Sequence, residues 1–432
     1  MHFHNIKKVA NKLNEIFLSF GCKVRSPHLC ALSWKINLLL INFKNKSNSK
    51  KKILVLYKSF GSIDLEELKN NKNNEYNFLY LSRRSIKIIF SSFFSKLNHE
   101  LTDDVYFSKN IKVNKAKKNY NVFLKKTLEI FNKKNNFLAI ISYNFRYRHE
   151  KELHSACKPL NIKFIVCQKE SLHYGDDSEI TKLYIKTNSK NGKYEGDYIF
   201  VYTEGFKKVL ISASICEQKK IIVTGMPRAD YYYGNLELSK KHILYLLPSW
   251  RPPPSLERVF LLDQKYYADH ITKIILDFAE NNPNEKIIIK TKMKKNHLIP
   301  LDDLINTKKL KNVSILKGGN IGSLIKDSKA VIGFQSSALI ESLILKKPII
   351  VPYFDINNSE KFKKCTLNLE ECSYYAYDEN SMKRYLNDIC SNKIGFPVID
   401  DEKRKNIINH YIGNIDGKSS NYLLNALNKI LN

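Results

Sequence analysis

The sequence predicts an α/β protein with two Rossmann-like domains, and three observations support this. Short runs of branched and aromatic residues, each long enough for one strand, alternate with segments of helical periodicity. That alternation is typical of a doubly wound parallel sheet. The runs form two series, separated by a polar stretch at residues 231–242. At 432 residues, the chain is long enough to give each series its own hydrophobic core.

The first series of runs predicts the strands of an N-terminal domain, which we expect to cover residues 1–235. Helical segments are expected between the strands, for example at residues 150–160 and 205–213. The pattern leaves open the place of residues 1–50. Within them, the apolar segment INLLLINF at 36–43 is expected to be a strand or another buried segment. The six strand-like runs lie at residues 52–57, 77–81, 137–142, 163–167, 198–203 and 220–225.

The second series predicts a C-terminal domain over residues 240–400, followed by helices at 401–432 that pack back on the domains. Residues 265–280 and 321–327 have the pattern of helices between its strands. Two strand series joined by a polar link indicate two separate parallel sheets. The five runs of this series lie at residues 243–249, 286–291, 312–316, 330–334 and 348–352.

The stretch GFQSSALIESLILKKPIIVP at residues 333–352 joins two of these strands through a helix. Ser336 or Ser337 can cap the helix, because a serine hydroxyl accepts a hydrogen bond from an N–H group of the first turn. Leu339 and Leu343 then fall on one helix face. A helix N-terminus that follows a parallel strand is also a place where hydroxyl and amide groups converge on a phosphate. The alternative is an ordinary capped helix that binds no ligand.

The chain is strongly basic. Its 72 Lys and Arg residues exceed its 42 Asp and Glu residues, which gives a formal net charge of +30 at pH 7. This balance favours polyanionic partners such as nucleotides, nucleic acid or an anionic membrane surface. The lysines are spread along the chain, and no helix-turn-helix, RNA-recognition or zinc pattern accompanies them. A specific nucleic-acid partner is therefore not expected.

Cysteine usage and hydropathy favour a cytoplasmic protein. The eight cysteines form no Cys-x-x-Cys pair and no close Cys/His cluster, which indicates reduced, mostly buried thiols. The N-terminal segment lacks the uninterrupted apolar core of a signal peptide. No run reaches the ~18 apolar residues of a membrane-spanning helix. Any membrane contact is therefore expected to be peripheral, at the inner face of the cytoplasmic membrane.

Three segments, taken in order, resemble the C-terminal half of a GT-B glycosyltransferase. They are YLLPSWR at 245–251, IIIKTK at 287–292 and the serine-containing stretch at 333–352. The likeness is to bacterial surface-polysaccharide enzymes: CDP-glycerol glycerophosphotransferases, capsule Kdo-type transferases and their relatives. The segment VTGMPRAD at 223–230 likewise resembles the TGxPRxD segment that closes their first domain. The resemblance covers roughly residues 137–360 and implies two Rossmann-like domains with parallel sheets that face a central cleft.

The resemblance implies that the second domain binds the nucleotide donor. The residues at the matching positions are Ser249, Arg251, Lys290, Lys292, Ser336, Ser337 and Glu341. These families commonly have Lys-x-His where this chain has Lys290 and Lys292, so a role specific to histidine does not carry over. Glu341 is expected to bind ribose or sugar hydroxyls, and the alternative is an exposed helix glutamate.

Transfer from a nucleotide donor leaves negative charge on the departing phosphate, which fixed positive charge must stabilise. The chain contains no Asp-x-Asp motif of the kind that metal-using enzymes bring. We therefore expect a phosphate clamp without a metal, made by Arg251, the lysines at 290 and 292, and the turn that contains Ser336 and Ser337. We call this turn the serine turn. The alternative for each lysine is a solvated surface position.

The acceptor side is expected to come from the N-terminal domain. The loop CQKESLHYGDDSE at 167–179 follows a predicted strand. A general base that removes a proton from a hydroxyl must be a carboxylate or an imidazole. Glu170 and His173 are therefore the catalytic candidates, with Asp176 behind them. The alternative is a polar turn.

Two further segments are expected to contribute to the acceptor side and the cleft. SYNFRYRHE at 142–150 also follows a strand, so Asn144, Arg146 and Arg148 are expected to hold an anionic acceptor. The alternative for the arginines is a surface or interface position. Arg228 is expected to contact a phosphate or the other domain. A structural pair between Arg228 and Asp230 is the alternative.

Together these features predict a metal-independent transferase of cell-envelope or capsule polysaccharide biosynthesis. It would move a sugar or polyol-phosphate group from a nucleotide-activated donor to a surface glycan or lipid-linked acceptor. The family likeness favours a CMP or CDP donor, and no other cofactor is expected. One alternative is a nucleotide-sugar epimerase or hydrolase of the same fold, which turns over the donor without an acceptor. Another is a non-catalytic scaffold of polysaccharide assembly.

Overall fold

The computed structural model describes residues 2–42, 51–57, 63–69, 71–97, 101, 103–169, 193–234, 236–247, 264–291, 301, 305–306, 308–317, 319–354 and 366–432. The chain divides into two compact units. Unit 1 takes in the described residues up to Lys169, those of Lys193–Arg228 and the terminal segment Lys418–Asn432. Unit 2 takes in the described residues of Ala229–Gly417.

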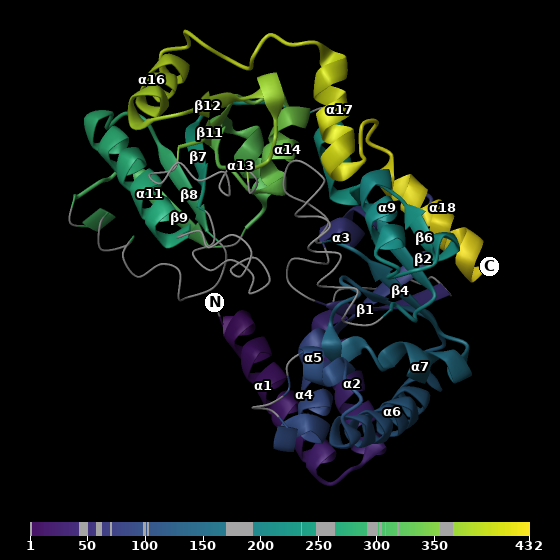
Figure 1. Ribbon diagram of the computed structural model, residues 1–432. Helices are drawn as coiled ribbons and strands as arrows, with labels where there is room; N and C mark the ends of the chain where they lie inside the picture. The colour runs from purple at the N-terminus through teal and green to yellow at the C-terminus, as the bar shows by residue number, and fades with distance from the viewer. Residues whose placement is uncertain are drawn as a thin grey trace. The chain divides into compact units, whose positions relative to one another are not determined.

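Unit 1 is built on a six-stranded sheet in the order β2-β1-β3-β4-β5-β6 (Figure 1). All neighbouring strands run parallel. This agrees with the α/β fold that the alternation of strands and helices predicts. The strands are β1 (Lys51–Tyr57), β2 (Tyr76–Ser82), β3 (Phe137–Ser142), β4 (Lys163–Cys167), β5 (Tyr198–Val201) and β6 (Ile221–Val223).

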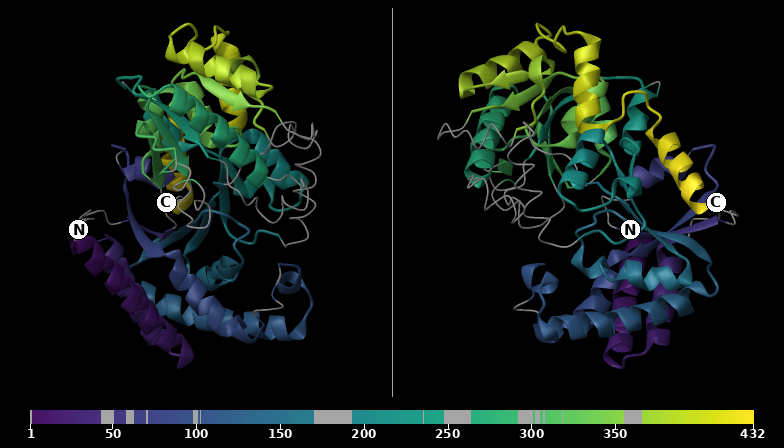
Figure 2. Two further views of the ribbon diagram at one scale, coloured as in Figure 1. Left: turned by 90° about the vertical axis from the view of Figure 1, so that its left-hand side faces the viewer. Right: turned by 45° about the vertical axis from the view of Figure 1, so that its right-hand side comes forward.

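Helices cover both faces of this sheet (Figure 2). On one face, α1, α2, α4 and α6 pack against one another, and α2 and α4 contact β2. On the other face, α3 and the C-terminal helix α18 close a core that contains Leu65, Leu424 and Leu427. The helices are α1 (His2–Lys23), α2 (Pro27–Asn42), α3 (Ile63–Lys69), α4 (Arg83–Phe94), α5 (Asp103–Phe107), α6 (Ile111–Asn132), α7 (Leu153–Cys157), α9 (Glu204–Ser212) and α18 (Ser419–Leu431).

Short 3-10 helices join these elements. They are η1 (Ser95–Leu97), η2 (Arg148–Glu150), η3 (Lys158–Leu160), η4 (Gln218–Lys220) and η5 (Pro227–Tyr233). The helix expected at 150–160 is therefore present in three pieces, η2, α7 and η3. Gly225, just before η5, has a φ angle of 70°. Glycine adopts this left-handed conformation without steric cost, which explains the residue at this turn.

Residues 36–42 of the segment INLLLINF form the last turns of helix α2. Of the two expected assignments, a strand or another buried segment, the strand is therefore wrong. A run of apolar residues does not distinguish a strand from a buried helix. The amide of Asn42, at the end of α2, bonds both backbone groups of Tyr80: Nδ2 donates to its carbonyl oxygen and Oδ1 accepts from its N–H, each at 2.9 Å. The Asn37 side chain accepts a hydrogen bond from Ser82 N in the same way. These two asparagines therefore satisfy backbone groups of the edge strand β2.

Unit 2 contains a second six-stranded parallel sheet, in the order β12-β11-β10-β7-β8-β9. Helices α11 and α16 pack together, as do α13, α14 and α17, on either side of it (Figure 1). The strands are β7 (His242–Leu246), β8 (Ile287–Thr291), β9 (Val313–Lys317), β10 (Ser328–Ile332), β11 (Ile349–Pro352) and β12 (Tyr374–Ala376). The helices are α11 (Gln264–Asn281), α13 (Ile321–Lys326), α14 (Ser337–Ile344), η7 (Glu370–Cys372), α16 (Glu379–Cys390) and α17 (Asp401–Ile412).

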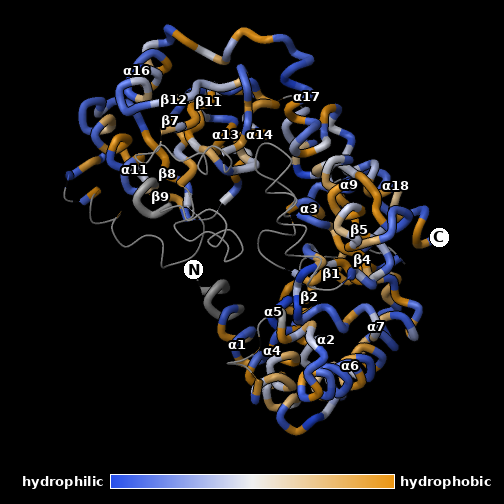
Figure 3. Tube along the Cα trace, in the orientation of Figure 1, coloured by the Kyte–Doolittle hydropathy of each residue, from blue (hydrophilic) through white to orange (hydrophobic). Residues whose placement is uncertain are grey.

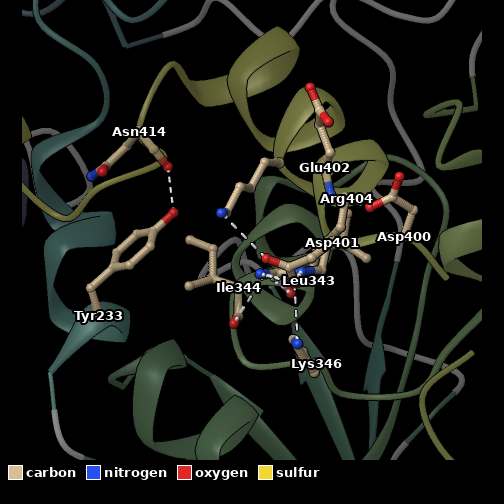
Figure 4. Close-up of polar contacts among 10 residues, drawn as sticks. Tyr233, Leu343, Ile344, Lys346, Asp400, Asp401, Glu402, Arg404 and Asn414 are labelled. Carbon is tan, nitrogen blue, oxygen red and sulfur yellow. Dashed lines mark hydrogen bonds and ion pairs between the residues drawn. The ribbon is translucent and has the colours of Figure 1, made fainter. Parts of the chain in front are cut away.

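Helix α17 fixes the C-terminal end of α14 (Figure 4). The guanidinium of Arg404 donates to the carbonyl oxygens of Leu343 at 3.0 Å and Ile344 at 3.5 Å. Carbonyls of a last helical turn have no partner inside the helix, and a cation there also complements the helix dipole. Asp401 pairs with Arg404 and with Lys346, and these two cations hold the pKa of its carboxyl well below its usual range.

Candidate functional site

The strand order places one topological switch point in each sheet. In unit 1, the chain runs from β1 outward to β2 and then returns to β3 on the other side of β1. In unit 2, it runs outward from β7 through β8 to β9 and returns to β10 on the other side of β7. Ligands of open α/β sheets bind beyond the carboxyl ends of the strands at such points. The ends of β1 and β3, and of β7 and β10, are therefore the candidate positions.

The predicted serine turn lies at the unit 2 switch point. Residues 333–336 leave β10 and lead into α14, with Ser336 as the helix N-cap. Its hydroxyl accepts a hydrogen bond from Ala338 N at 3.3 Å, and Ser337 is the first residue of the helix. A Cβ atom on Gly333 would lie 3.2 Å from Leu246 Cβ of β7. Glycine thus allows the turn to pass close to the end of β7.

Glu341 is buried, with only 1% of its surface exposed. The hydroxyl of Tyr232, also buried, donates to its Oε2 atom at 2.5 Å. The alternative of an exposed helix glutamate is therefore wrong. The contact ties α14 to η5, so it fixes the helix that carries the serine turn.

Lys290 lies near the carboxyl end of β8, on the same edge of the sheet as the serine turn. It is paired in register with Leu246 of β7. Because β7 alone separates β8 from β10, the two strand ends lie about 10 Å apart. The lysine is half-buried, its Nζ donates to Thr291 O at 3.2 Å, and burial lowers its pKa. It is therefore not the fully solvated surface lysine of the alternative.

Six of the predicted site residues lie outside the described residues, and their roles stay predictions. Three belong to the expected donor side and three to the expected acceptor side. They are Ser249, Arg251 and Lys292, and Glu170, His173 and Asp176.

Asn144 and Arg146 lie in the loop that follows β3, at the unit 1 switch point. Asn144 is buried, and its Oδ1 atom accepts a hydrogen bond from Arg146 N at 2.8 Å. The side chain of Gln168, which follows β4, accepts one from Phe145 N at 3.2 Å. These bonds fix the loop at the carboxyl edge. The neighbouring Arg148 donates to Leu101 O at 2.7 Å, a contact that holds the protein's own backbone.

Asn144 also lines a cavity of about 150 Å³ within unit 1. Aromatic side chains form much of its wall, and Tyr106 donates to Glu152 Oε1 at 2.8 Å. Arg146 is not among its lining residues. The lysines and glutamates of the lining are Lys117, Lys151, Lys193, Glu150, Glu152 and Glu195, and His154 lies beside them. Acidic side chains thus balance the lysines, and the cavity does not have the excess positive charge of an anion site.

Arg228 forms a buried cluster with Asp64 and Tyr202 in unit 1. Its guanidinium lies 2.9 Å from Asp64 Oδ1 and donates to the Tyr202 hydroxyl at 3.2 Å. The Tyr202 hydroxyl in turn donates to Asp64 Oδ2. Asp64 opens α3 and Tyr202 follows β5, so the cluster lies at the carboxyl edge of the sheet. The expected contact with a phosphate or the other domain, and the alternative pair with Asp230, stay predictions.

Asp64, Tyr202 and Tyr232 are not singled out by the sequence analysis. Asp64 comes soon after the predicted strand at 52–57, and Tyr202 lies at the end of the one predicted at 198–203. A polar group at the carboxyl end of a strand is the signal that could identify them. Tyr232 carries no such signal, because its partner Glu341 lies 109 residues later in the chain.

No protein-family model matches the sequence, and no curated protein matches it significantly. Solved structures do match. Structures of two variants of the wall teichoic acid polymerase TagF align with TM-scores of 0.52 and 0.50, and each alignment covers 98% of both chains at 14% sequence identity. The chain has the GT-B fold. The two parallel sheets, each with its helices, confirm the two Rossmann-like domains that the sequence resemblance implies.

A UDP-GlcNAc 2-epimerase from Neisseria meningitidis, bound to UDP-GlcNAc, aligns with a TM-score of 0.46. That alignment covers 88% of this chain and 100% of the epimerase at 14% identity. At so low a score the likeness carries no argument. Within the part of the chain that the structure describes, every helix is too short or too polar to cross a membrane.

Proposed function

We propose that this protein is a transferase that moves a sugar or polyol-phosphate group from a nucleotide-activated donor to a surface glycan or lipid-linked acceptor. The observation that carries the proposal is the serine turn, because Ser336 and Ser337 open α14 at the switch point of the unit 2 sheet. Ligands bind at this position in open α/β sheets. The likeness of the GT-B fold to that of TagF, a wall teichoic acid polymerase by name, supports the class of reaction.

In the proposed reaction, the bond between the transferred group and the donor phosphate breaks. The acceptor oxygen bonds to the transferred group and loses its proton to a base. The departing phosphate gains negative charge, which in this proposal the N–H groups at the start of α14 and the ammonium group of Lys290 stabilise. In this proposal Ser249, Arg251 and Lys292 complete the clamp, and the donor is of the CMP or CDP type.

On the acceptor side, we propose that the cavity beside Asn144 takes a neutral, hydroxyl-rich part of the acceptor. Its lysines and glutamates balance one another, and its aromatic walls suit the apolar faces of a sugar or polyol. This differs from the anionic acceptor that the arginines of the loop suggest in the sequence. Glu170 and His173 remain the proposed bases, with Asp176 behind them.

The first test is a thermal-shift screen of the full chain against CMP, CDP, UDP, GDP and their sugar or glycerol conjugates, with and without EDTA. A ligand that binds only the folded state stabilises it by about 2.7 kcal/mol at a hundred times its dissociation constant. We expect one nucleotide class to raise the Tm of the protein. Ser337→Ala should remove most of that shift, whereas Ser323→Ala, which alters an exposed serine of α13, should leave it unchanged.

Ser336→Ala separates capping from ligand binding. Loss of the cap should lower the free energy of unfolding by about 1 kcal/mol with or without nucleotide. A Ser337→Ala variant that keeps the full ligand-induced shift would remove the serine turn from the site. A screen in which no nucleotide raises the Tm would contradict the proposed function itself.

An activity assay with the nucleotide so identified then decides among the reactions. A transferase releases nucleotide only when an acceptor is present. Turnover of the donor without an acceptor would instead indicate an epimerase or hydrolase. Binding without any turnover would indicate a scaffold of polysaccharide assembly.

A further inference from the structure

Helix α1 is held firmly to unit 1 along one face. Leu18 and Cys22 are buried between α1 and its neighbours, and α1 contacts α2 and α4 (Figures 1 and 2). Asn14 Nδ2 donates to Ser33 O of α2 at 3.1 Å, and the Ser33 hydroxyl donates to Asn14 Oδ1 at 3.0 Å. The orientation of the helix about its own axis is therefore fixed.

The opposite face of α1 carries four exposed apolar side chains. Val9, Leu13, Ile16 and Phe20 are 58%, 61%, 59% and 54% exposed. Their spacing of four, three and four residues places them on one side of the helix, since 3.6 residues make a turn. We call these four residues the apolar stripe. Single exposed apolar residues are common on proteins, but a contiguous row of large ones marks an interaction surface.

Three lysines flank the apolar stripe. Lys8, Lys12 and Lys23 are exposed, and at 100° per residue all three fall on the same side of it. The acidic residue of this helix, Glu15, pairs with Arg84 of α4 at 3.0 Å. The border of the stripe is therefore basic, as is the chain as a whole, with its formal net charge of +30. Figure 3 shows the apolar and polar residues alternating along α1.

Charge complementarity favours a lipid surface over a second copy of the chain. The stripe spacing is also that of a coiled coil, but it lasts for only two heptads, fewer than a stable coiled coil needs. Two copies of α1 would in addition bring lysine flanks together with no acidic partners to pair them. An anionic bilayer offers negative charge to the lysines and an apolar layer to the stripe.

We propose that α1 lies in the surface of an anionic membrane. The apolar stripe is inserted below the lipid headgroups, and Lys8, Lys12 and Lys23 lie among the lipid phosphates. A helix of 22 residues is about 33 Å long, so all four stripe residues can enter the same surface. This inference does not rest on the proposed function. It places the protein at the surface where a lipid-linked acceptor would be found.

The test is flotation of the full chain with two kinds of vesicle: phosphatidylcholine alone, and phosphatidylcholine in which part is replaced by phosphatidylglycerol. The wild-type protein should float with the second kind far more than with the first. The double variant Leu13→Gln with Ile16→Gln should bind at least about tenfold more weakly, because each side chain loses its burial in lipid. Lys12→Gln with Lys23→Gln should lose roughly fivefold per lysine, and only with the anionic vesicles.

Matched control variants replace exposed apolar residues or exposed lysines of another helix, α6. Ile111→Gln with Val122→Gln replaces two exposed apolar residues, and Lys115→Gln with Lys118→Gln removes two exposed lysines. Both controls should float like the wild type, and all four variants should keep its Tm. Equal binding of the stripe variants and the controls, or no flotation at all, would overturn the proposal. So would sedimentation velocity that shows a dimer in wild type and a monomer in Leu13→Gln with Ile16→Gln, since the stripe would then join two copies.

Discussion

Among single residues, His149 shows how burial sets a charge state. Its ring packs on Phe90 with centroids 5.4 Å apart, and burial together with Arg83, Lys87 and Arg148 lowers its pKa from 6.5 to about 3. The folded protein therefore keeps this imidazole neutral at pH 5, where the unfolded chain protonates it. The contribution of the neutral His149 to the free energy of unfolding is therefore fully present above about pH 6.5. It is lost as the pH falls toward 3, by about 1.4 kcal/mol per pH unit between these values.

We predict that His149→Phe, which keeps an aromatic ring beside Phe90, removes this part of the acid sensitivity. The measurement is the free energy of urea unfolding at pH 7 and at pH 5. The wild type should lose more stability between the two than the variant does. His28→Phe, on an exposed part of α2, is the control and should behave like the wild type. Equal losses in wild type and His149→Phe would contradict the lowered pKa.

Residue roles that depend on near neighbours in sequence can be predicted, and those that depend on distant ones cannot. The cap by Ser336 follows from its place just before a helix, and the structure confirms it. The burial of Glu341 does not, because it requires Tyr232. In the same way, Asp64 and Arg228 pair across 164 positions of sequence, so no local pattern relates them.

Among the elements, the end of α14 depends on a side chain from another helix. Two lysines, Lys346 and Lys347, follow the last residues of α14 in the chain. In the structure Arg404 of α17 bonds the terminal carbonyls, while Lys347 is buried and donates to Ser239 O and Ser328 O at 2.9 Å. Lys347 thus joins two segments of unit 2.

We predict that Arg404→Ala lowers the free energy of unfolding of unit 2 by about 2 kcal/mol, since hydrogen bonds from a charged group are lost and buried carbonyls remain unpaired. The measurement is urea unfolding, with hydrogen exchange of α14 to locate the effect. Lys403→Ala, which alters an exposed neighbour on α17, should change stability by less than about 0.5 kcal/mol. If the two variants are equally stable, the contact of α17 with α14 contributes nothing.

Strand positions are the part of the fold that the sequence predicts best. The run at 137–142 coincides with β3 and the run at 163–167 with β4, because parallel strands are buried on both faces and appear as continuous apolar runs. The sheet edges are harder. Strand β12 has three residues, only one of them buried, and so leaves no comparable run. At the other sheet, residues 36–42 are apolar enough for a strand but belong to α2.

For the whole molecule, the path of the C-terminal segment matters most. Helix α17 packs on α14 in unit 2, while α18, which begins seven residues after α17 ends, completes the core of unit 1. Composition cannot reveal this division, because both helices contain apolar residues that could pack on either sheet. The chain thus returns to its first unit after it has built its second.

We predict that Leu427→Ala in α18 destabilises unit 1 by about 2–5 kcal/mol through the cavity it leaves. Hydrogen exchange followed by mass spectrometry should show faster exchange in β1 and β3, and unchanged exchange in β7 and β10. Leu339→Ala in α14, a fully buried residue of unit 2, is the matched variant and should give the reverse pattern. Acceleration in both units with either variant would mean that they unfold as one.

The asparagine at the end of α2 has a consequence for how the folded protein meets other copies of itself. An exposed edge strand is a template for a strand from another chain, since its N–H and C=O groups await partners. A carboxamide side chain has the same donor and acceptor as a peptide group, and Asn42 places one against Tyr80 of β2 where the next strand would lie. At that position β2 is already paired, and an incoming chain would have to displace a bond the protein makes with itself. The side chains of Asn42 and, at Ser82, of Asn37 thereby oppose the addition of a further strand at this edge of the sheet.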